Sequence, residues 1–310
     1  MKRHVWPVRL RSKPLLPHRV QWREWLRGFL ARGLRLNAYL IGVMSFNVRG
    51  AFRDRGKADA WDNRAVLNVE TIERYAPDVI GFQELQKGNL ETYRERLPQY
   101  AHVLGPRYGN RTPHSFNAIF FDVRRLELLD SGGFWLSETP ERYSASWETR
   151  VARSANWVHL RFSKTGRSFL HLNTHLDHVS RIARAKGSKL ILRRLAAEEG
   201  PVVVTGDFNC RPGTPVYRNF VRGGFVDTYL AAGNEDTADA NTFHAFKGTR
   251  YREARPGLGP RRIDWILLKD PRGRIHTVSH SIVRDHDEGS GAYPSDHYPV
   301  LAELTGEFGE

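Results

Sequence analysis

The feature that most constrains the fold is a series of short apolar segments of strand length between residues 39 and 304. Residues 39–48 (YLIGVMSFNV), 78–83 (DVIGFQ) and 201–206 (PVVVTG) have the β-branched and aromatic content of buried strands. Neighbouring strands are often too close in sequence for a helical crossover, so a simple doubly wound parallel sheet is excluded and mixed sheets are favoured. Further strands are predicted at 117–121, 126–129, 157–162, 168–174, 262–268, 275–283 and 300–304.

Helices are fewer than strands in this pattern, and we expect them at 61–74, 88–97 and 180–199. No internal repeat and no linker interrupts the pattern, so the sequence predicts one domain over residues 38–310. The first helix has apolar residues with helical spacing at Ala65, Val66, Val69 and Ile72.

The basic character of the chain belongs mainly to its amino-terminal arm. The net charge is +14, but residues 1–43 hold ten cations and one acid, which leaves 38 cations and 33 acids, a net of +5, for residues 44–310. The arm at 1–37 is rich in Arg, Trp and Pro without apolar periodicity, so we expect it to be disordered or peripheral. A nucleic-acid or membrane-surface arm is the alternative, and a body of +5 gives only weak support for a nucleic-acid groove.

Composition limits the class of protein. With 40% hydrophobic residues the chain has enough apolar content for a folded core. No stretch approaches the roughly 20 apolar residues of a transmembrane helix, and no export signal is recognisable. The single cysteine, Cys210, excludes an intrachain disulfide and a cysteine-based zinc site. We therefore expect a cytoplasmic protein.

Polar residues suited to metal or phosphate follow most of the apolar segments. Side chains at strand ends are held by a rigid scaffold and remain open at the rim of the sheet. Each residue alone has an ordinary structural explanation, such as a turn cap or an ion pair. Several converging carboxylates, however, require a cation or a proton, and Mg²⁺ prefers such oxygen ligands. The residues are Asn47 (SFN), Glu84 (GFQE), His175 and Asp177 (NTHLDH), Asp207 and Asn209 (GDFN), Asp264 (RIDWILL), and Asp296 and His297 (PSDH).

The order of these motifs resembles that of a known superfamily. The run from MSFNVRG through IGFQE, NTHLDH, VVVTGDFN and RIDWIL to YPSDHYPV is similar to the endonuclease/exonuclease/phosphatase superfamily. This superfamily includes apurinic endonucleases, pancreatic-type deoxyribonucleases, sphingomyelinases, inositol polyphosphate 5-phosphatases and nocturnin-like deadenylases. The resemblance implies a four-layer α/β sandwich, in which two mixed β-sheets pack face to face and are flanked by helices. FWLSETP and TFHAFKG resemble a bacterial subgroup nearer to the nocturnin-like members.

The resemblance also implies a role for each motif residue. Glu84 would be the principal Mg²⁺ ligand, assisted by Asn47, with Asp296 beside the metal. Asp207 would orient or deprotonate the attacking water. Asp264 would hold His297 in the tautomer that contacts the scissile phosphate. Residues expected to position the phosphate are Asn209 and His175.

Other residues are candidates for the substrate rim. Trp135, Trp147 and Trp157 offer rings for stacking on a base or a sugar, although tryptophans beside strands more often belong to the core. Cys210 is expected to be a packing residue. The rim candidates are His114, Asn117, Arg153, Asp177, His178 and His244.

The sequence thus predicts a Mg²⁺-dependent phosphoester hydrolase, with Mn²⁺ as a substitute. Metal and imidazolium would neutralise charge on the phosphoryl oxygens while the activated water attacks in line. A phosphodiester of nucleic acid or of a nucleotide is the favoured substrate. The first alternative is a small phosphorylated metabolite, such as a sugar or inositol phosphate or a phospholipid headgroup. The non-enzyme alternative is a basic module that binds nucleic acid or a membrane surface.

Overall fold

Two six-stranded mixed β-sheets pack face to face in the computed structural model, which describes residues 39–51, 57–106, 116–149, 151–255, 257 and 259–308. The predicted arm at 1–37 lies outside the described residues, so its boundary with the domain remains a prediction. Among the described residues, no helix is long and apolar enough to cross a membrane.

The first sheet has its amino-terminal strand near the middle. Strand β1 pairs in parallel with β2 and antiparallel with β12, which places the two ends of the domain side by side. Its strands, in spatial order, are β11 (Ile275–Ile282), β12 (Val300–Gly306), β1 (Tyr39–Asn47), β2 (Val79–Leu85), β4 (Phe116–Asp122) and β3 (Tyr100–Leu104).

The second sheet repeats this mixed arrangement. Strands β7 and β8 run parallel, while β5, β6 and β10 pair antiparallel with their neighbours. Its strands, in spatial order, are β5 (Leu126–Trp135), β6 (Ser154–Phe162), β7 (Ser168–His175), β8 (Val202–Asp207), β10 (Asp264–Lys269) and β9 (Val226–Asp227).

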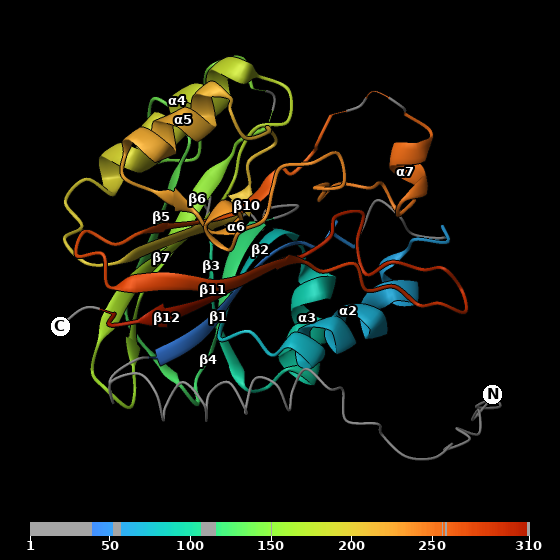
Figure 1. The fold of residues 1–310 in the computed structure, drawn as a ribbon, viewed down its shortest axis with the longest axis horizontal. Coiled ribbons are helices and arrows are strands. Elements are labelled where there is room, and N and C mark those ends of the chain that lie inside the picture. Colours follow the sequence, from blue (N-terminus) through green and yellow to red (C-terminus); the bar gives the residue numbers. More distant parts are fainter. Residues whose placement is uncertain are drawn as a thin grey trace. The chain divides into compact units, whose positions relative to one another are not determined.

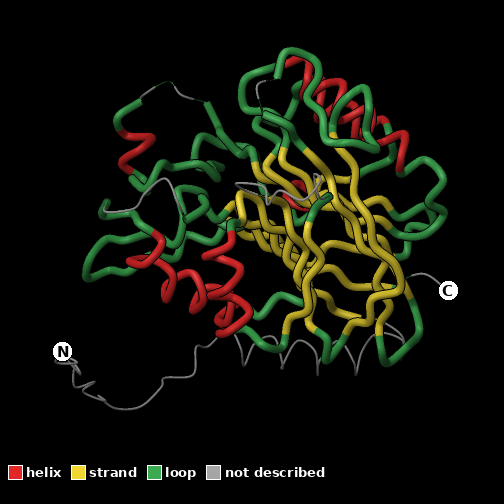
Figure 2. Tube along the Cα trace, turned by 180° about the vertical axis from the view of Figure 1, so that it is seen from behind, coloured by secondary structure: helices red, strands yellow, loops and turns green. Residues whose placement is uncertain are grey.

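Helices cover the outer faces of both sheets, so the domain has the four layers that were predicted (Figures 1 and 2). Helices α2 (Trp61–Tyr75) and α3 (Lys87–Arg96) share an apolar cluster with the first sheet. Helices α4 (Arg181–Arg194) and α5 (Pro215–Arg222) share one with the second. Two short helices, α6 (Thr228–Ala231) and α7 (Arg250–Glu253), lie in the chain between α5 and β10.

A third apolar cluster fills the space between the sheets. Ile41 and Val43 of β1, Val158 and Leu160 of β6, and Ile266 of β10 are all fully buried in it. Fully burying one such aliphatic side chain stabilises a fold by about 1.5–3 kcal/mol. The alternation along these strands turns one set of side chains inward to this cluster and the other set outward to the helices.

Several predicted elements needed correction. The strand expected at 126–129 continues to Trp135, because Gly132 lets the indole of Trp157 lie directly against the backbone of β5. The helix expected at 180–199 ends at Arg194. The sequence prediction omitted β3, β9 and helices α5 to α7.

The buried face of α2 also differs from the predicted one. Val66 is 57% exposed, whereas Arg64 and Asn68 are buried. The pattern of apolar residues alone therefore located the helix but misplaced part of its inner face.

One rim of the sandwich collects the polar strand ends. β1 and β2 are parallel, as are β7 and β8, so Asn47, Glu84, His175 and Asp207 all emerge at the same edge. β10 begins there with Asp264, which is the register partner of Asp207. The topology thus brings together residues that are up to 250 positions apart in the sequence.

Candidate active site

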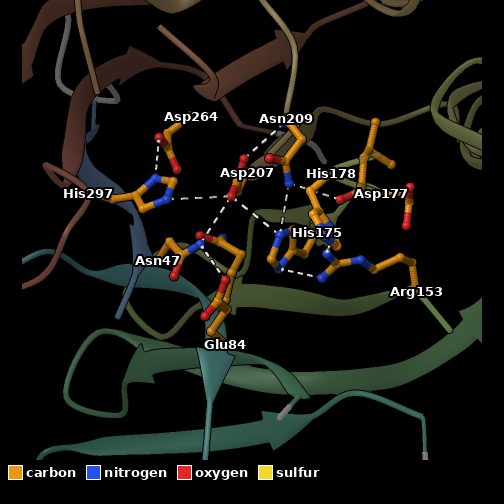
Figure 3. Close-up of polar contacts among 12 residues, drawn as sticks. Asn47, Glu84, Arg153, His175, Asp177, His178, Asp207, Asn209, Asp264 and His297 are labelled. Atoms are coloured by element: carbon orange, nitrogen blue, oxygen red, sulfur yellow. Dashed lines mark hydrogen bonds and ion pairs between the residues drawn. The ribbon is translucent and has the colours of Figure 1, made fainter. Parts of the chain in front are cut away.

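Asp207 lies at the centre of the rim (Figure 3). Its Oδ2 accepts a hydrogen bond from Asn47 Nδ2 at 3.0 Å and lies 3.3 Å from His175 Nε2. Its Oδ1 accepts from the backbone N–H of Asn209 at 2.9 Å. Burial, and then the neighbouring carboxylate of Asp264, raise the pKa of Asp207 to about 7. A carboxyl with this pKa is suited to act as a general base near neutral pH.

His297 forms a charged pair with Asp264. Its Nδ1 lies 3.0 Å from Asp264 Oδ2, and its Nε2 lies 3.9 Å from Asp207 Oδ2. Burial lowers the pKa of His297, but attraction to Asp264 and the hydrogen bond between them outweigh burial and raise it to about 10. The ring is therefore an imidazolium at neutral pH, able to neutralise a phosphoryl oxygen or to donate a proton.

Arg153 connects two histidines on the other side of Asp207. Its two terminal nitrogens donate to Nδ1 of His175 and to Nδ1 of His178, each at 3.0 Å. Because a guanidinium only donates, Nδ1 of His175 must accept and Nε2 must carry the proton. That proton points to Asp207, and the amide of Asn209, 3.0 Å from the same Nε2, donates instead to the carbonyl of Leu176.

The electrostatics of this side agree with the tautomer. Burial, followed by the charge of Arg153, holds the pKa of His175 well below its ordinary value. The His175 ring is thus neutral, in contrast to His297. Burial also lowers the pKa of Arg153, which Glu84 and Asp207 partly offset.

Glu84 and Asp296 are the carboxylates that lie beside this centre. Burial raises the pKa of Asp296, His297 opposes the rise, and the charge of Glu84 adds to it. The guanidinium of Arg49 is close to Asp296, with its Nη1 3.8 Å from Asp296 Oδ2. Two neighbouring buried or half-buried carboxylates provide a site for a hard cation, and the amide of Asn47, 3.4 Å from Glu84 Oε1, adds a further ligand group. The donor set fits a magnesium ion.

A second group of possible ligands fits a proton better than a metal. One ligand atom from each of Asp207, Asp264 and His297 lies within 4.8 Å of the others. His297, however, is protonated between the two carboxylates, and a protonated imidazole offers no lone pair to a metal. We therefore regard these three residues as an ion triad and not as the metal site.

Three residues of the rim have a strained backbone. Arg49, Glu84 and Asn209 have φ angles of 54°, 58° and 50°, in the left-handed region that non-glycine residues rarely adopt. Each such residue costs about 1–3 kcal/mol, and such strain is concentrated at functional sites. The strained backbone therefore lies in the same part of the rim as the polar contacts around Asp207.

Sequence reasoning missed the side chain that fixes two loops of the rim. The guanidinium of Arg64 is buried and donates to the carbonyls of Val48 at 2.7 Å, Pro294 at 3.0 Å and Arg49 at 2.6 Å. Asn68 donates to the Pro294 carbonyl as well, at 3.0 Å. These bonds connect the chain that follows Asn47 to the segment that precedes Asp296. The signal in the sequence was a pair of polar residues, four positions apart, within an otherwise amphipathic helix.

The remaining predicted rim residues that the structure describes make contacts within the protein. Asn117 is buried and donates to the carbonyl of Ser154 at 2.8 Å. The carboxylate of Asp177 accepts from Thr149 and from two backbone N–H groups at the start of α4. His244 is buried, and its ring stacks on that of Tyr298 with the two centroids 3.9 Å apart. The last candidate, His114, lies outside the described residues.

The aromatic and thiol candidates lie mainly in the packed layers. Trp135 is 6% exposed, while Trp147 and Trp157 are half-buried against the cluster under α4 and α5. Burial raises the pKa of Cys210 to about 12, so a thiolate nucleophile is not formed at neutral pH. Cys210 is a packing residue.

Comparison with known proteins identifies the family. The family model described as "Endonuclease/Exonuclease/phosphatase family" matches residues 44–297, most of the chain and all the motifs discussed above. The chain belongs to this family. Enzymes of the family hydrolyse phosphate esters and depend on divalent metal ions.

Individual relatives agree with this assignment. A family protein from Bacteroides thetaiotaomicron is 27% identical, with a TM-score of 0.76 over 87% of this chain and 99% of that one. A mannosyl-6-phosphatase from the same organism is 28% identical, with a TM-score of 0.74 over 85% and 99%. Human nocturnin is 26% identical over 86% of this chain. The chain spans 65% of the nocturnin sequence, less than two thirds of its length.

Proposed function

We propose that this protein is a Mg²⁺-dependent phosphodiesterase that acts on a nucleic acid or a nucleotide by in-line attack of water, with Mn²⁺ as a substitute ion. The observation that carries the proposal is the alignment of Asp264, His297 and Asp207, in which one ring nitrogen of His297 lies 3.0 Å from Asp264 Oδ2 and the other lies 3.9 Å from Asp207 Oδ2. A carboxyl with a pKa of about 7 faces an imidazolium with a pKa of about 10. Such a pair supplies a base and an acid at one site.

The residues around Asp207 then divide the chemistry between them. Asp207 accepts a proton from the attacking water, while Asn47, Asn209 and the Nε2 proton of His175 hold its carboxylate in place. His297, fixed by Asp264, supplies positive charge at the phosphoryl oxygens.

The metal site completes the charge balance. Glu84, Asp296 and Asn47 would hold the ion, which when bound supplies Lewis-acid polarisation of the phosphoryl group. Arg153 contributes a second fixed positive charge on the opposite side of Asp207.

A phosphatase for a small phosphorylated metabolite is the second candidate. Its support is the mannosyl-6-phosphatase relative, which this chain matches over 99% of that relative's length. Both candidates use the same phosphate chemistry. The intact set of polar residues argues against a binding module without activity. A cytoplasmic location remains a prediction, supported by the single cysteine.

The test measures hydrolysis and metal binding on the full chain. We expect turnover of bis-p-nitrophenyl phosphate or p-nitrophenyl phosphate with Mg²⁺ or Mn²⁺, lost on addition of EDTA. Glu84→Gln should weaken metal binding in calorimetry and abolish turnover. Glu127→Gln, an exposed glutamate paired with Arg161, is the matched control and should change neither. Turnover that persists in both EDTA and Glu84→Gln would overturn the proposal.

Substrate preference separates the two candidates. Faster turnover of the diester, and of single-stranded DNA or RNA or a dinucleotide, supports the phosphodiesterase. Faster turnover of the monoester and of mannose 6-phosphate supports the metabolite phosphatase instead.

A further inference from the structure

Asn173, on β7, is a fully buried polar side chain in the layer between the two sheets. Such a side chain is costly unless it is hydrogen-bonded. Its Oδ1 accepts from Gln83 Nε2 at 2.7 Å and from Thr205 Oγ1 at 3.1 Å. Its Nδ2 donates to the backbone carbonyls of Phe82 at 2.7 Å and Ala118 at 3.2 Å. Both lone pairs and both protons of the amide are therefore used, which fixes its orientation.

The two carbonyls that Asn173 binds lie where the pairing of β2 with β4 is interrupted. Phe82 pairs with Ala118, but the next residue of β2 in register with β4 is Leu85. The extra residue at positions 83–84 makes this a β-bulge, which disrupts the ladder and re-aims the side chains of its strand. Glu84, the candidate metal ligand, lies in the bulge with a φ of 58°. Asn173 therefore reaches across from the second sheet and supplies donors at the point where Glu84 is oriented.

The absence of a side chain at Gly81 allows this close approach of the two sheets. A Cβ atom there would lie 2.0 Å from Thr205 Oγ1 and 2.6 Å from Asn173 Oδ1, far inside van der Waals contact. A glycine within a strand often marks such a site, where another part of the chain approaches the backbone. The hydrogen bonds of Asn173 are thus built into the packing of the sheets.

The hydrogen bonds that hold Asn173 from its own sheet have a fixed direction. The Thr205 hydroxyl has one proton and donates it to Asn173 Oδ1, which can only accept. Thr205 Oγ1 therefore accepts from His171 Nε2, 2.9 Å away. All three side chains are fully buried. Hydrogen bonds in such a chain polarise one another, so removal of the Thr205 hydroxyl should weaken the hold of Asn173 on the bulge.

We propose that Asn173 is a positioning residue for Glu84. From the opposite sheet it holds the β-bulge that presents the Glu84 carboxylate to the metal, and Thr205 and His171 hold Asn173 in turn. This role rests on the proposed function and deepens it, because it assigns the orientation of a metal ligand to residues of the other sheet. A residue that only stabilises the fold would not affect the affinity for the ion, whereas a positioning residue would.

The test measures binding of Mn²⁺ alone to the full-length protein by calorimetry. Asn173→Asp keeps the shape of the side chain, but a carboxyl group donates at most one hydrogen bond, so at least one carbonyl loses its donor. We expect the affinity for Mn²⁺ to fall about 10- to 100-fold, as for other residues that orient metal ligands. In turnover of a p-nitrophenyl ester, the half-saturating Mn²⁺ concentration should rise, and kcat at saturating Mn²⁺ should recover.

Asn156→Asp is the matched control. Asn156 is equally buried and is the register partner of Asn173 on β6, but its amide donates to the carbonyl of Val103 on β3, at 3.3 Å. Both substitutions should lower the stability measured by chemical denaturation. Only Asn173→Asp should lower the affinity for Mn²⁺, and equal affinities in the two variants would overturn the proposal.

Two variants of Thr205 decide the matter if Asn173→Asp does not fold. Thr205→Val keeps the shape without the hydroxyl and should weaken Mn²⁺ binding, whereas Thr205→Ser keeps the hydroxyl and should preserve it. Equal affinities in these two variants would contradict the proposal.

Glu84→Gln separates this proposal from the proposed function. Weakened Mn²⁺ binding in Glu84→Gln, with full binding in Asn173→Asp and Thr205→Val, would overturn the role of Asn173 alone. Mn²⁺ binding that Glu84→Gln leaves unchanged would overturn the metal role of Glu84, and the role of Asn173 with it.

Discussion

The imidazole of His297 lies between two carboxylates: its Nδ1 is hydrogen-bonded to Asp264 at 3.0 Å, and its Nε2 lies 3.9 Å from Asp207. Asp264 is the first residue of β10, and the register of that strand places it opposite Asp207 on β8. The pairing of two strands therefore sets the geometry of the proposed acid and base.

Removing the negative charge from this pair should slow the reaction without unfolding the protein. In Asp264→Asn the amide no longer stabilises the imidazolium, and we expect kcat to fall about 10²- to 10⁴-fold with little change in KM. Steady-state kinetics on a p-nitrophenyl ester measure this. Metal affinity in calorimetry should stay unchanged, and a large loss of metal affinity would make Asp264 a ligand instead.

Replacing Arg153 by lysine should separate charge from geometry. The guanidinium contacts both His175 and His178, whereas an ammonium is a compact point charge without that planar fork. We expect kcat/KM to fall about tenfold or more, since a bidentate contact is lost. Arg161→Lys, a half-buried arginine on neighbouring β6 that pairs with Glu127, is the control. Equal kinetics of the two variants would rule out a role for Arg153 in the site.

Arg64→Lys should lower both stability and activity. Several buried carbonyls would lose their donor, and each unsatisfied group costs about 1–3 kcal/mol, so we expect the free energy of unfolding to fall by about 3 kcal/mol or more. Chemical denaturation measures this. Arg74→Lys, on the same helix with an exposed ion pair to Asp285, should change stability by less than about 1 kcal/mol. Similar losses in the two variants would contradict the special position of Arg64.

Acid should destabilise the protein through two buried histidines. Burial lowers the pKa of both His171 and His280 to about 3. In the unfolded chain a histidine takes up its proton near pH 6.5, so each histidine removes about 1.4 kcal/mol of stability per pH unit as the pH falls from 6.5 towards 3. The stability is fully present above pH 6.5, because the ring is then neutral in both states.

A variant of one histidine tests this effect. His280→Asn should lose about 2 kcal/mol less than the unmodified protein between pH 7 and pH 5 in denaturant titrations. His276→Asn, an exposed histidine on the same strand, is the control and should follow the unmodified protein. An unchanged pH dependence in His280→Asn would exclude this residue as a source of acid sensitivity.

The sequence predicted the strands best where apolar runs end in polar motifs, as at Asn47 and Asp207. Those strands are buried on both faces, so they are continuous apolar runs that can be recognised in the sequence. Strand β3 escaped prediction because its residues are half-exposed and lack a continuous apolar run. The far half of β5 escaped because Gly132 and Gly133 weaken the strand signal, although the close approach of Trp157 requires a glycine there.

The motif residues of the site could be predicted from the sequence, but the contacts that hold them in place could not. Order along the chain and a family resemblance were enough to select Glu84, Asp207 and His297. The tautomer of His175 depends on Arg153, which lies in another segment, and no local pattern reveals that contact. Likewise, the place of His244 follows from a bridge between Phe243 and His297 that only the tertiary structure shows.

The left-handed backbone at Arg49, Glu84 and Asn209 has a consequence for directed evolution of this enzyme. Glycine relaxes such positions at almost no steric cost, so glycine substitutions there would be selected in a screen for heat resistance alone. The same substitutions delete a carboxylate, a guanidinium or an amide from the rim. A library sorted only by melting temperature would therefore enrich robust but inert proteins, and the activity assay has to be applied in the same round.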